Sequence, residues 1–257
     1  EIMERQVNKF KEGLQNGQPQ IGLWLSLCSN TVAELVGYSG YDWLLLDSEH
    51  APNEPAAMLT QLQGMATGTA SAVVRPAWND AVMIKRFLDI GAQSFLVPYV
   101  ETAEEAAAAV AAVRYPPRGM RGVATSTRAN RFARVKDYFN HADDEICMLV
   151  QVETQKGYDN LDSILATDGV DGVFVGPSDL SAGLGHLGNP GHPDVQAAII
   201  DINERCKAAG KPAGILAPVE EDAKRYLDAG FMFVAVGADI GLLIKHSDAL
   251  LKRFKPG

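Results

Sequence analysis

Met148-Leu-Val-Gln-Val-Glu153 is a short apolar run that ends in a carboxylate, and Gly172-Val-Phe-Val-Gly-Pro-Ser-Asp179 repeats the pattern one strand–helix unit later. Such runs between polar turns are typical of strands buried on both faces, as in a parallel sheet. Gln151 and Glu153 are two residues apart, so an extended strand places both on the same side. Asp179 follows a Gly-Pro-Ser turn that should open the next helix. The pattern predicts two carboxylates at the carboxyl ends of neighbouring strands, where they can share one hard cation.

The same rhythm continues through the whole chain. Helix start signals separate the apolar runs, for example the capping box Thr102-Ala-Glu-Glu105. Eight alternations of strand and helix predict an α/β fold, a closed parallel (β/α)8 TIM barrel, as one domain over 1–257. We expect an additional N-terminal helix within 1–16 and a C-terminal helix at 239–254. The expected strands are Ile21–Leu27, Trp43–Asp47, Ala72–Pro76, Ser94–Val100, Met148–Glu153, Gly172–Pro177, Ala213–Leu216 and Met232–Gly237.

The composition excludes several classes of protein. The formal net charge is −9, and no basic run is long enough to follow a phosphate backbone, so a nucleic-acid partner is not expected. The three cysteines form no Cys-x-x-Cys pair, and their odd number fits a reducing cytoplasm better than a disulfide framework. No apolar stretch approaches the roughly 20 residues of a membrane span. We therefore expect a cytoplasmic protein without a membrane partner.

One connection, residues 114–147, is too long for a barrel loop. It contains Tyr115-Pro-Pro-Arg-Gly-Met-Arg-Gly122 and then Arg128, Arg131 and Arg134, with a short helix expected at 133–142. One interpretation is a surface excursion or a subunit contact. The other is a basic loop that guides an anionic substrate to the site. The sequence leaves both open.

Polar side chains follow four of the expected strands. Barrel enzymes carry their active sites at the carboxyl ends of the strands, so these residues are the candidates for chemistry. They are Asp47, Glu49 and His50 after the second strand, Arg75 after the third, Gln151 and Glu153 on the fifth, and Ser178 and Asp179 after the sixth.

Glu153 and Asp179 offer oxygen ligands only, which favours Mg²⁺ or Mn²⁺, with Co²⁺ also possible. Two protein ligands leave coordination positions that substrate oxygens can fill. Alternatively, Asp179 only caps the next helix and Glu153 only forms an ion pair. No organic cofactor is expected.

His50 and Arg75 complete the candidate set. A histidine beside two acids at a strand end suits a general base near neutral pH, with Asp47 or Glu49 to orient it. The planar fork of Arg75 suits a carboxylate or a developing enolate, although an ion pair with Asp47 or Glu49 is an equal alternative. None of the lysines lies in an expected strand, so a Schiff-base mechanism is not favoured.

Five motifs in this order resemble the HpcH/HpaI family of class II pyruvate aldolases, which includes 4-hydroxy-2-oxoheptanedioate and 2-dehydro-3-deoxyglucarate aldolases. The similarity runs from about Gly13 to Phe254. The motifs are Trp43-Leu-Leu-Leu-Asp-Ser-Glu-His-Ala-Pro-Asn53, Val74-Arg-Pro-Ala-Trp-Asn-Asp80, Tyr115-Pro-Pro-x-Gly-x-Arg-Gly122, Gln151-Val-Glu-Thr154 and Gly172-Val-Phe-Val-Gly-Pro-Ser-Asp-Leu-Ser181.

The resemblance implies roles for individual residues. By it, Glu153 and Asp179 hold the metal, His50 is the base and Arg75 stabilises the enolate. Gln151 and the amides of Ser178 and Asp179 bind the 2-oxo acid. The family also pairs its histidine with an aspartate that matches Asp89, which the sequence places near the far end of a helix, away from the barrel mouth. The substrate-binding set is completed by Gly176, Leu216 and the tryptophan beside Leu23, Trp24.

The resemblance also implies an activity and an assembly. The expected reaction is a reversible, metal-dependent aldol cleavage of a 4-hydroxy-2-oxo acid to pyruvate and an aldehyde, such as succinate semialdehyde, as in aromatic compound catabolism. A homohexamer that exchanges its last helix between subunits is expected. Two alternatives remain: an oxaloacetate decarboxylase that uses the same pyruvate-enolate site, and a non-catalytic barrel that binds 2-oxo acids.

Overall fold

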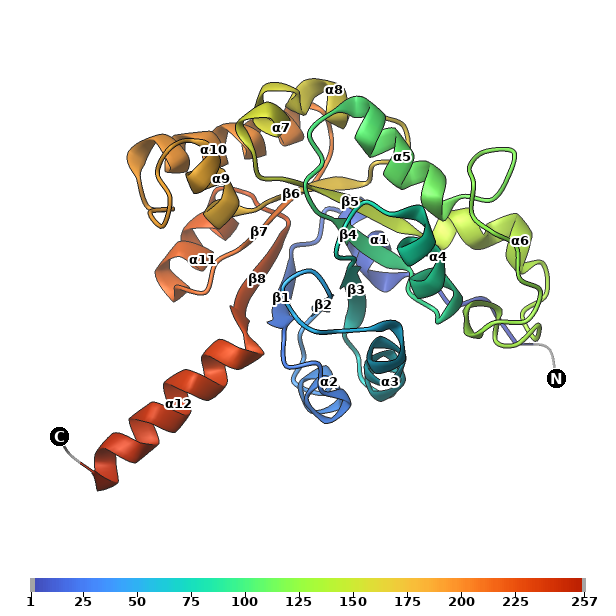
Figure 1. Ribbon diagram of the computed structural model, residues 1–257, viewed down its shortest axis with the longest axis horizontal. Coiled ribbons are helices and arrows are strands. Elements are labelled where there is room, and N and C mark those ends of the chain that lie inside the picture. Colours follow the sequence, from blue (N-terminus) through green and yellow to red (C-terminus); the bar gives the residue numbers. More distant parts are fainter. Residues whose placement is uncertain (1–2, 256–257) are drawn as a thin grey trace.

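Eight parallel strands close into a barrel in the computed structural model, which describes residues 3–255 (Figure 1). Each strand pairs with its neighbours in the sequence, and β8 closes the sheet against β1. The predicted TIM barrel is confirmed. The strands are β1 (Gln20–Leu25), β2 (Trp43–Asp47), β3 (Ser71–Arg75), β4 (Ser94–Val97), β5 (Cys147–Val152), β6 (Gly172–Val175), β7 (Ala213–Leu216) and β8 (Phe233–Ala238).

The helices surround this barrel, except for the last one. The α-helices are α1 (Lys9–Gln15), α2 (Asn30–Gly37), α3 (Pro55–Met65), α4 (Ala81–Asp89), α5 (Ala103–Val113), α6 (Tyr138–His141), α7 (Gln155–Asp159), α8 (Leu161–Leu165), α9 (Pro177–Gly183), α10 (Pro193–Ala208), α11 (Glu220–Asp228) and α12 (Asp239–Phe254). Two 3₁₀ turns, η1 (Arg128–Asn130) and η2 (Ala142–Glu145), lie between α5 and β5. No helix within residues 3–255 is long and apolar enough to cross a membrane.

Two strands end earlier than the sequence predicted, and the causes lie in the hydrogen bonding. β1 ends at Leu25 because the amides of Ser26 and Leu27 donate to the carboxylate of Asp239 instead of to a strand. β4 ends at Val97 because the next residue is a proline, which has no N–H to donate.

The interior of the barrel is filled with aromatic and aliphatic side chains. Alternate strand residues point inward, so Trp43 faces the interior and its neighbour Leu44 faces the helices. The ring of Phe10, from α1, lies 5.7 Å from the ring of Trp43 and 5.9 Å from that of Phe233. Phe10 is fully buried, so α1 closes the amino-terminal end of the barrel.

The N-terminal helix is shorter than the range 1–16 in which it was expected. It begins at Lys9 because the side chain of Asn8 caps it by accepting a hydrogen bond from the Lys11 amide. Before Asn8 the chain is not helical, and Met3 forms a parallel bridge with Val135. Residues 1–2 lie outside the described part of the chain.

The long connection packs at the amino-terminal end of the barrel within one chain. Arg128 donates to the carbonyls of Ile90 and Leu62, which lie near the ends of α4 and α3. Arg121 is buried, with its guanidinium stacked 4.4 Å from the centre of the Tyr115 ring. These contacts favour the interpretation of a surface excursion over that of a substrate-guiding loop.

The helix expected at 133–142 was wrong in its start. Phe132, Ala133 and Asp137 have positive φ angles, so the chain cannot be helical before Tyr138.

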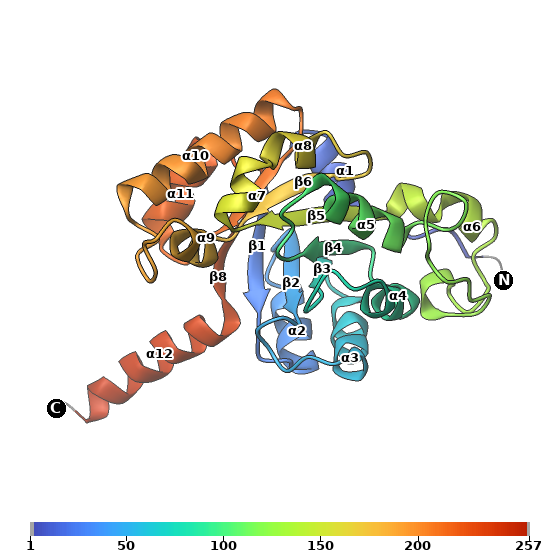
Figure 2. The same cartoon turned by 45° about the horizontal axis from the view of Figure 1, so that its top comes forward.

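α12 has the predicted bounds and extends away from the barrel, as Figures 1 and 2 show. Its large apolar side chains lie in solvent in the single chain. They are Ile240, Leu242, Leu243, Ile244, Leu250, Leu251 and Phe254. This set exceeds what an isolated soluble surface normally exposes.

Replacing Phe10 with Ala should lower the free energy of unfolding by about 3–5 kcal/mol, because the change leaves a cavity at the base of the barrel. Urea denaturation measures this value. Leu187 is 83% exposed, so Leu187→Ala serves as the control and should change stability by less than about 0.5 kcal/mol. Equal stabilities of the two variants would contradict the role of Phe10.

Candidate active site

Arg75, the last residue of β3, forms a two-pronged ion pair with Asp47 at the end of β2. Its Nε lies 2.8 Å from Asp47 Oδ1 and its Nη2 lies 2.7 Å from Asp47 Oδ2. The guanidinium also stacks 4.7 Å from the centre of the Trp24 ring, while the indole N–H of Trp24 donates to Asp47. Burial alone would raise the pKa of Asp47, but its hydrogen bonds with Arg75 hold that pKa below its usual value. The arginine is thereby fixed in one orientation.

Arg75 still has donors to spare. Its Nη1 lies 2.8 Å from Glu49 Oε2 in an ion pair that lacks hydrogen-bond geometry. A guanidinium carries five N–H groups, and these contacts with Asp47 and Glu49 occupy only part of them. The ion-pair alternative is therefore correct as geometry, and it leaves room for an anion at the barrel mouth.

His50 lies beside Glu49. Its Nε2 is 3.8 Å from Glu49 Oε1, and its side chain is 66% exposed, so a substrate can reach the ring. Of the two acids considered for orienting the histidine, Glu49 is the one in contact. Burial raises the pKa of Glu49, and the charges of Asp47 and Asp179 raise it further against the opposing effect of Arg75.

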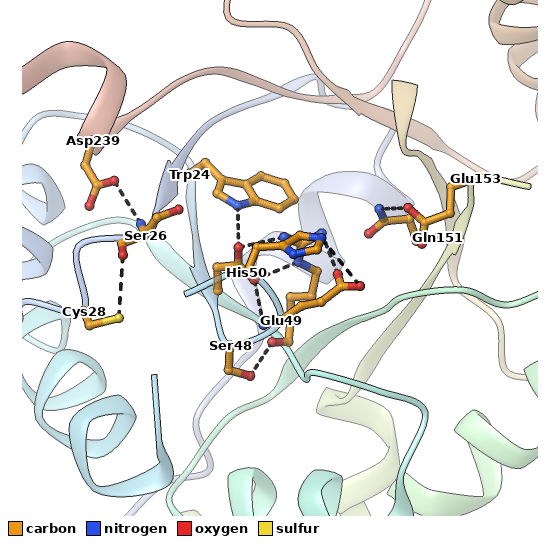
Figure 3. Close-up of polar contacts among 11 residues, drawn as sticks. Trp24, Ser26, Cys28, Ser48, Glu49, His50, Gln151, Glu153 and Asp239 are labelled. Carbon is orange, nitrogen blue, oxygen red and sulfur yellow. Dashed lines mark hydrogen bonds and ion pairs between the residues drawn. The ribbon is translucent and has the colours of Figure 1, made fainter. Parts of the chain in front are cut away.

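Glu153 follows β5 and is almost completely buried. Figure 3 shows Gln151 beside it, with the Gln151 amide donating to Glu153 Oε2. The backbone N–H of Tyr99 donates to Glu153 Oε1 over 2.8 Å. Burial raises the pKa of Glu153 to about 8, and the charges of Asp179 and Glu49 contribute. A carboxyl group in this environment is stabilised as an anion only by a nearby cation.

Asp179 and Ser178 occupy the first turn of α9, as predicted for a helix that opens after Gly-Pro-Ser. Asp179 is partly exposed and Ser178 is exposed. Gly176, just before the helix, lies against the carboxylate pair: a Cβ there would come within 2.5 Å of Glu153 Oε2 and 2.8 Å of Gln151 Nε2. The absence of a side chain at 176 keeps this space clear.

These residues fit a divalent cation. Glu153 and Asp179 supply carboxylate oxygens, and the effect of the Asp179 charge on the Glu153 pKa shows that the two groups are near each other. The side-chain oxygen of Gln151 is buried without a hydrogen-bond partner, so it remains available to a ligand. Oxygen donors that crowd negative charge are the surroundings that a hard cation prefers.

Asp89 does not join this group within one chain. It ends α4, and helices of such a barrel run antiparallel to the strands, so Asp89 lies at the end of the barrel opposite His50. Burial raises its pKa, against the opposing charges of Arg121 and Lys85. Its role beside the histidine stays a prediction that requires a second subunit.

The remaining predicted residues lie at the carboxyl ends of their strands. Leu216 ends β7 and packs, partly buried, against the cluster inside the barrel. Trp24 on β1 is 5.6 Å from the ring of Phe174, and it forms the floor beneath Arg75.

The sequence analysis missed two contributions. The residue that fixes Glu153 is Tyr99, which has a positive φ of 56° and acts through its backbone N–H. A backbone donor leaves no signal in a sequence. Asp239 was read only as a helix opener, but its carboxylate also binds the amides of Ser26 and Leu27 (Figure 3).

The model of the HpcH/HpaI aldolase/citrate lyase family matches residues 20–246. The chain belongs to this family. Members of the family depend on a metal ion, in accord with the carboxylate pair described above.

Two named relatives match almost the whole chain. A protein named 4-hydroxy-2-oxo-heptane-1,7-dioate aldolase, from Klebsiella pneumoniae subsp. pneumoniae, is 56% identical over 248 residues, covering 96% of this chain and 94% of the relative. A protein named 5-keto-4-deoxy-D-glucarate aldolase, from Salmonella paratyphi A, is 54% identical over 248 residues, covering 96% and 97%.

Solved structures agree with the fold. The structure of an HpcH/HpaI family protein from Burkholderia cenocepacia J2315 superposes with a TM-score of 0.94 at 40% identity, covering 96% of this chain and 99% of the other. The structure of the HpcH/HpaI aldolase from Desulfitobacterium hafniense DCB-2 gives 0.90 at 28% identity, with 96% of both chains covered.

Replacing Gly176 with Ala should weaken Mg²⁺ binding by about tenfold or more, because the new methyl group displaces Glu153 or Gln151. Isothermal titration of the metal-free protein measures the affinity. Gly37→Ala is the matched control, since a Cβ there meets only Met65 at an ordinary 3.9 Å. Unchanged affinity in Gly176→Ala would contradict the proximity of residue 176 to the metal.

The metal-free protein should lose stability as the pH rises from about 4.5 to about 8. Over this window the folded state holds a proton on Glu153 that the unfolded state has released, and each unit of pKa difference corresponds to about 1.4 kcal/mol. Glu153→Gln should reduce this slope. Urea denaturation in EDTA at several pH values measures it, with the exposed Glu34→Gln as control.

Proposed function

We propose that this protein is a metal-dependent class II pyruvate aldolase, which cleaves a 4-hydroxy-2-oxo acid reversibly to pyruvate and an aldehyde. The observation that carries the proposal is the site at the barrel mouth, where Glu153 and Asp179 lie near one another and face an exposed histidine and a fixed arginine. Family membership and the two named aldolases at more than 50% identity support it.

Each residue of the chain has a task in this reaction. His50 accepts the proton of the C4 hydroxyl group as the C3–C4 bond breaks, which releases the aldehyde and leaves the pyruvate enolate. Arg75 directs its unoccupied N–H groups at the oxyanion. Gln151 and the first turn of α9, with Ser178 and Asp179, hold the carboxylate of the 2-oxo acid.

Glu153 and Asp179 would hold the cation, for which we propose Mg²⁺ or Mn²⁺ on the basis of their oxygen ligands, with Co²⁺ as a further possibility. When bound, the cation supplies Lewis-acid polarisation of the 2-oxo group. The chain itself contributes orientation. Tyr99 and Gln151 fix the Glu153 oxygens, and Asp47 and Trp24 fix the guanidinium of Arg75.

The aldehyde lies beyond the enolate, toward the open side of the mouth. Trp78 and Tyr99 stand there as an exposed aromatic pair with ring centres 5.8 Å apart. Four carboxylates, including Asp179 and Glu153, raise the pKa of Tyr99 after burial, which places the phenol over the site. We propose a small aldehyde such as succinate semialdehyde as the second product.

The site also suits decarboxylation of oxaloacetate, because loss of CO₂ yields the same enolate. Assays of pyruvate release from a 4-hydroxy-2-oxo acid and from oxaloacetate separate the two activities. Faster turnover of oxaloacetate would make decarboxylation the main function. Binding of pyruvate and Mg²⁺ without any turnover would identify a non-catalytic barrel.

We further propose that α12 packs on another copy of this chain in a homohexamer. The apolar side chains of α12 are 41–78% exposed in the single chain, and burying them would stabilise an assembly. Contact between subunits is also the route by which Asp89 of one copy can approach the site of another.

Arg75→Lys should lower kcat about 10²–10³-fold, because lysine keeps the charge but loses the planar fork and its spare donors. Pyruvate release coupled to lactate dehydrogenase measures the rate. The control is Arg205→Lys, an arginine that pairs with Asp162 away from the mouth and should leave kcat within about twofold. A rate near that of the wild type in Arg75→Lys would remove Arg75 from the mechanism.

Leu243→Asp should break the assembly into smaller species without unfolding the barrel, because a buried charge at a subunit contact is costly. Light scattering after size exclusion measures the mass, and circular dichroism checks the fold. Lys252→Asp, at an exposed polar position of the same helix, is the control. A single-chain mass for the wild type would contradict the assembly.

A further inference from the structure

Three side chains capable of binding a metal converge outside the barrel mouth, in the loop between α9 and α10. They are His186, His192 and Asp194, whose ligand atoms lie within 4.8 Å of one another. His186 Nε2 is 3.3 Å and His192 Nδ1 is 3.6 Å from the same oxygen, Asp194 Oδ2. The two imidazole rings stack with centres 3.5 Å apart.

The backbone holds this loop in one shape. Gly185 and Gly188 adopt positive φ angles at its turns. The amide of His186 donates to the carbonyl of Ser181, and the amide of His192 donates to that of Asn189. The ligand atoms are therefore brought together by the main chain before any ion arrives, which lowers the entropic cost of binding one.

The hydrogen bonding leaves an electrostatic imbalance at the centre of the cluster. His192 Nδ1 accepts a hydrogen bond from the Asp194 amide at 3.2 Å, so in that state it cannot donate to the Asp194 carboxylate. A nitrogen lone pair and a carboxylate oxygen then lie 3.6 Å apart with no proton between them. A cation bound between His186, His192 and Asp194 removes this repulsion.

We propose that this cluster is a second metal site, for a borderline transition-metal ion such as Zn²⁺, Ni²⁺ or Cu²⁺. Two imidazoles and one carboxylate select these ions, whereas the all-oxygen pair at the barrel mouth selects Mg²⁺ or Mn²⁺. Water completes the coordination, since the cluster is partly exposed. Binding requires the His192 ring to give up its long bond to the Asp194 amide.

The position of the site gives it a structural task. The loop follows the last turn of α9, whose first turn carries Asp179, and it contains the N-cap of α10. An ion here ties the end of α9 to the start of α10. It therefore stabilises the barrel from outside and takes no part in the chemistry at the mouth.

Titration of the full-length, tag-free protein with Zn²⁺ in saturating Mg²⁺ tests the proposal. The wild type should bind one Zn²⁺ per chain at the loop, and His186→Gln should weaken this binding by about tenfold or more. His141→Gln is the matched control, because His141 pairs with Asp144 at 3.4 Å without a second histidine. That variant should bind like the wild type.

Two further measurements separate the loop from the barrel mouth. The Zn²⁺ bound at the loop should persist in Glu153→Gln, and it should raise the thermal midpoint of the wild type but not of His186→Gln. Electron paramagnetic resonance of one equivalent of Cu²⁺ should show coupling to two imidazole nitrogens, and to one in His186→Gln. Equal Zn²⁺ affinity in the wild type and in His186→Gln, or all-oxygen coordination of Cu²⁺, would overturn the proposal and reduce the cluster to a helix-capping network.

Discussion

Four carboxylates, Asp47, Glu49, Glu153 and Asp179, lie at the mouth of this barrel around one buried guanidinium, that of Arg75. The arginine balances Asp47 fully and Glu49 in part. Glu153 has no cation within its hydrogen bonds, and burial raises its pKa to about 8. This unbalanced negative charge is the constraint on which the rest depends, because it is tolerable only with protons or a divalent cation in place.

The barrel is the means by which these charges are held together. Each carboxylate comes from a different strand or strand-to-helix turn, and closure of the sheet brings their ends to one mouth. The interior below is packed with rings, from Phe10 at the base to Trp24 under Arg75. A rigid floor keeps the arginine and the acids from relaxing apart, so the field at the mouth is already set for an incoming oxyanion.

The two proposed metal sites follow from the same rule with different donors. At the mouth, oxygen ligands and open coordination positions suit an ion that works on a substrate. In the loop after α9, two imidazoles and a carboxylate suit an ion that ties two helices together. Asp179 in the first turn of α9 and His186 beyond its last turn place one short helix between them.

Sequence alone determined the eightfold rhythm, the closed barrel, the range of α12 and the set of polar residues at the strand ends, because apolar periodicity and turn signals are local. It also placed Asp89 away from the mouth. Only the tertiary structure decided that Glu49 is the acid beside His50, that the Tyr99 amide holds Glu153, and that α1 begins at Lys9. Backbone donors, left-handed residues such as Ala133, and contacts such as that of Asp239 with the end of β1 depend on distant segments. They leave no periodic trace, because the energy of each arises only when the chain has closed on itself.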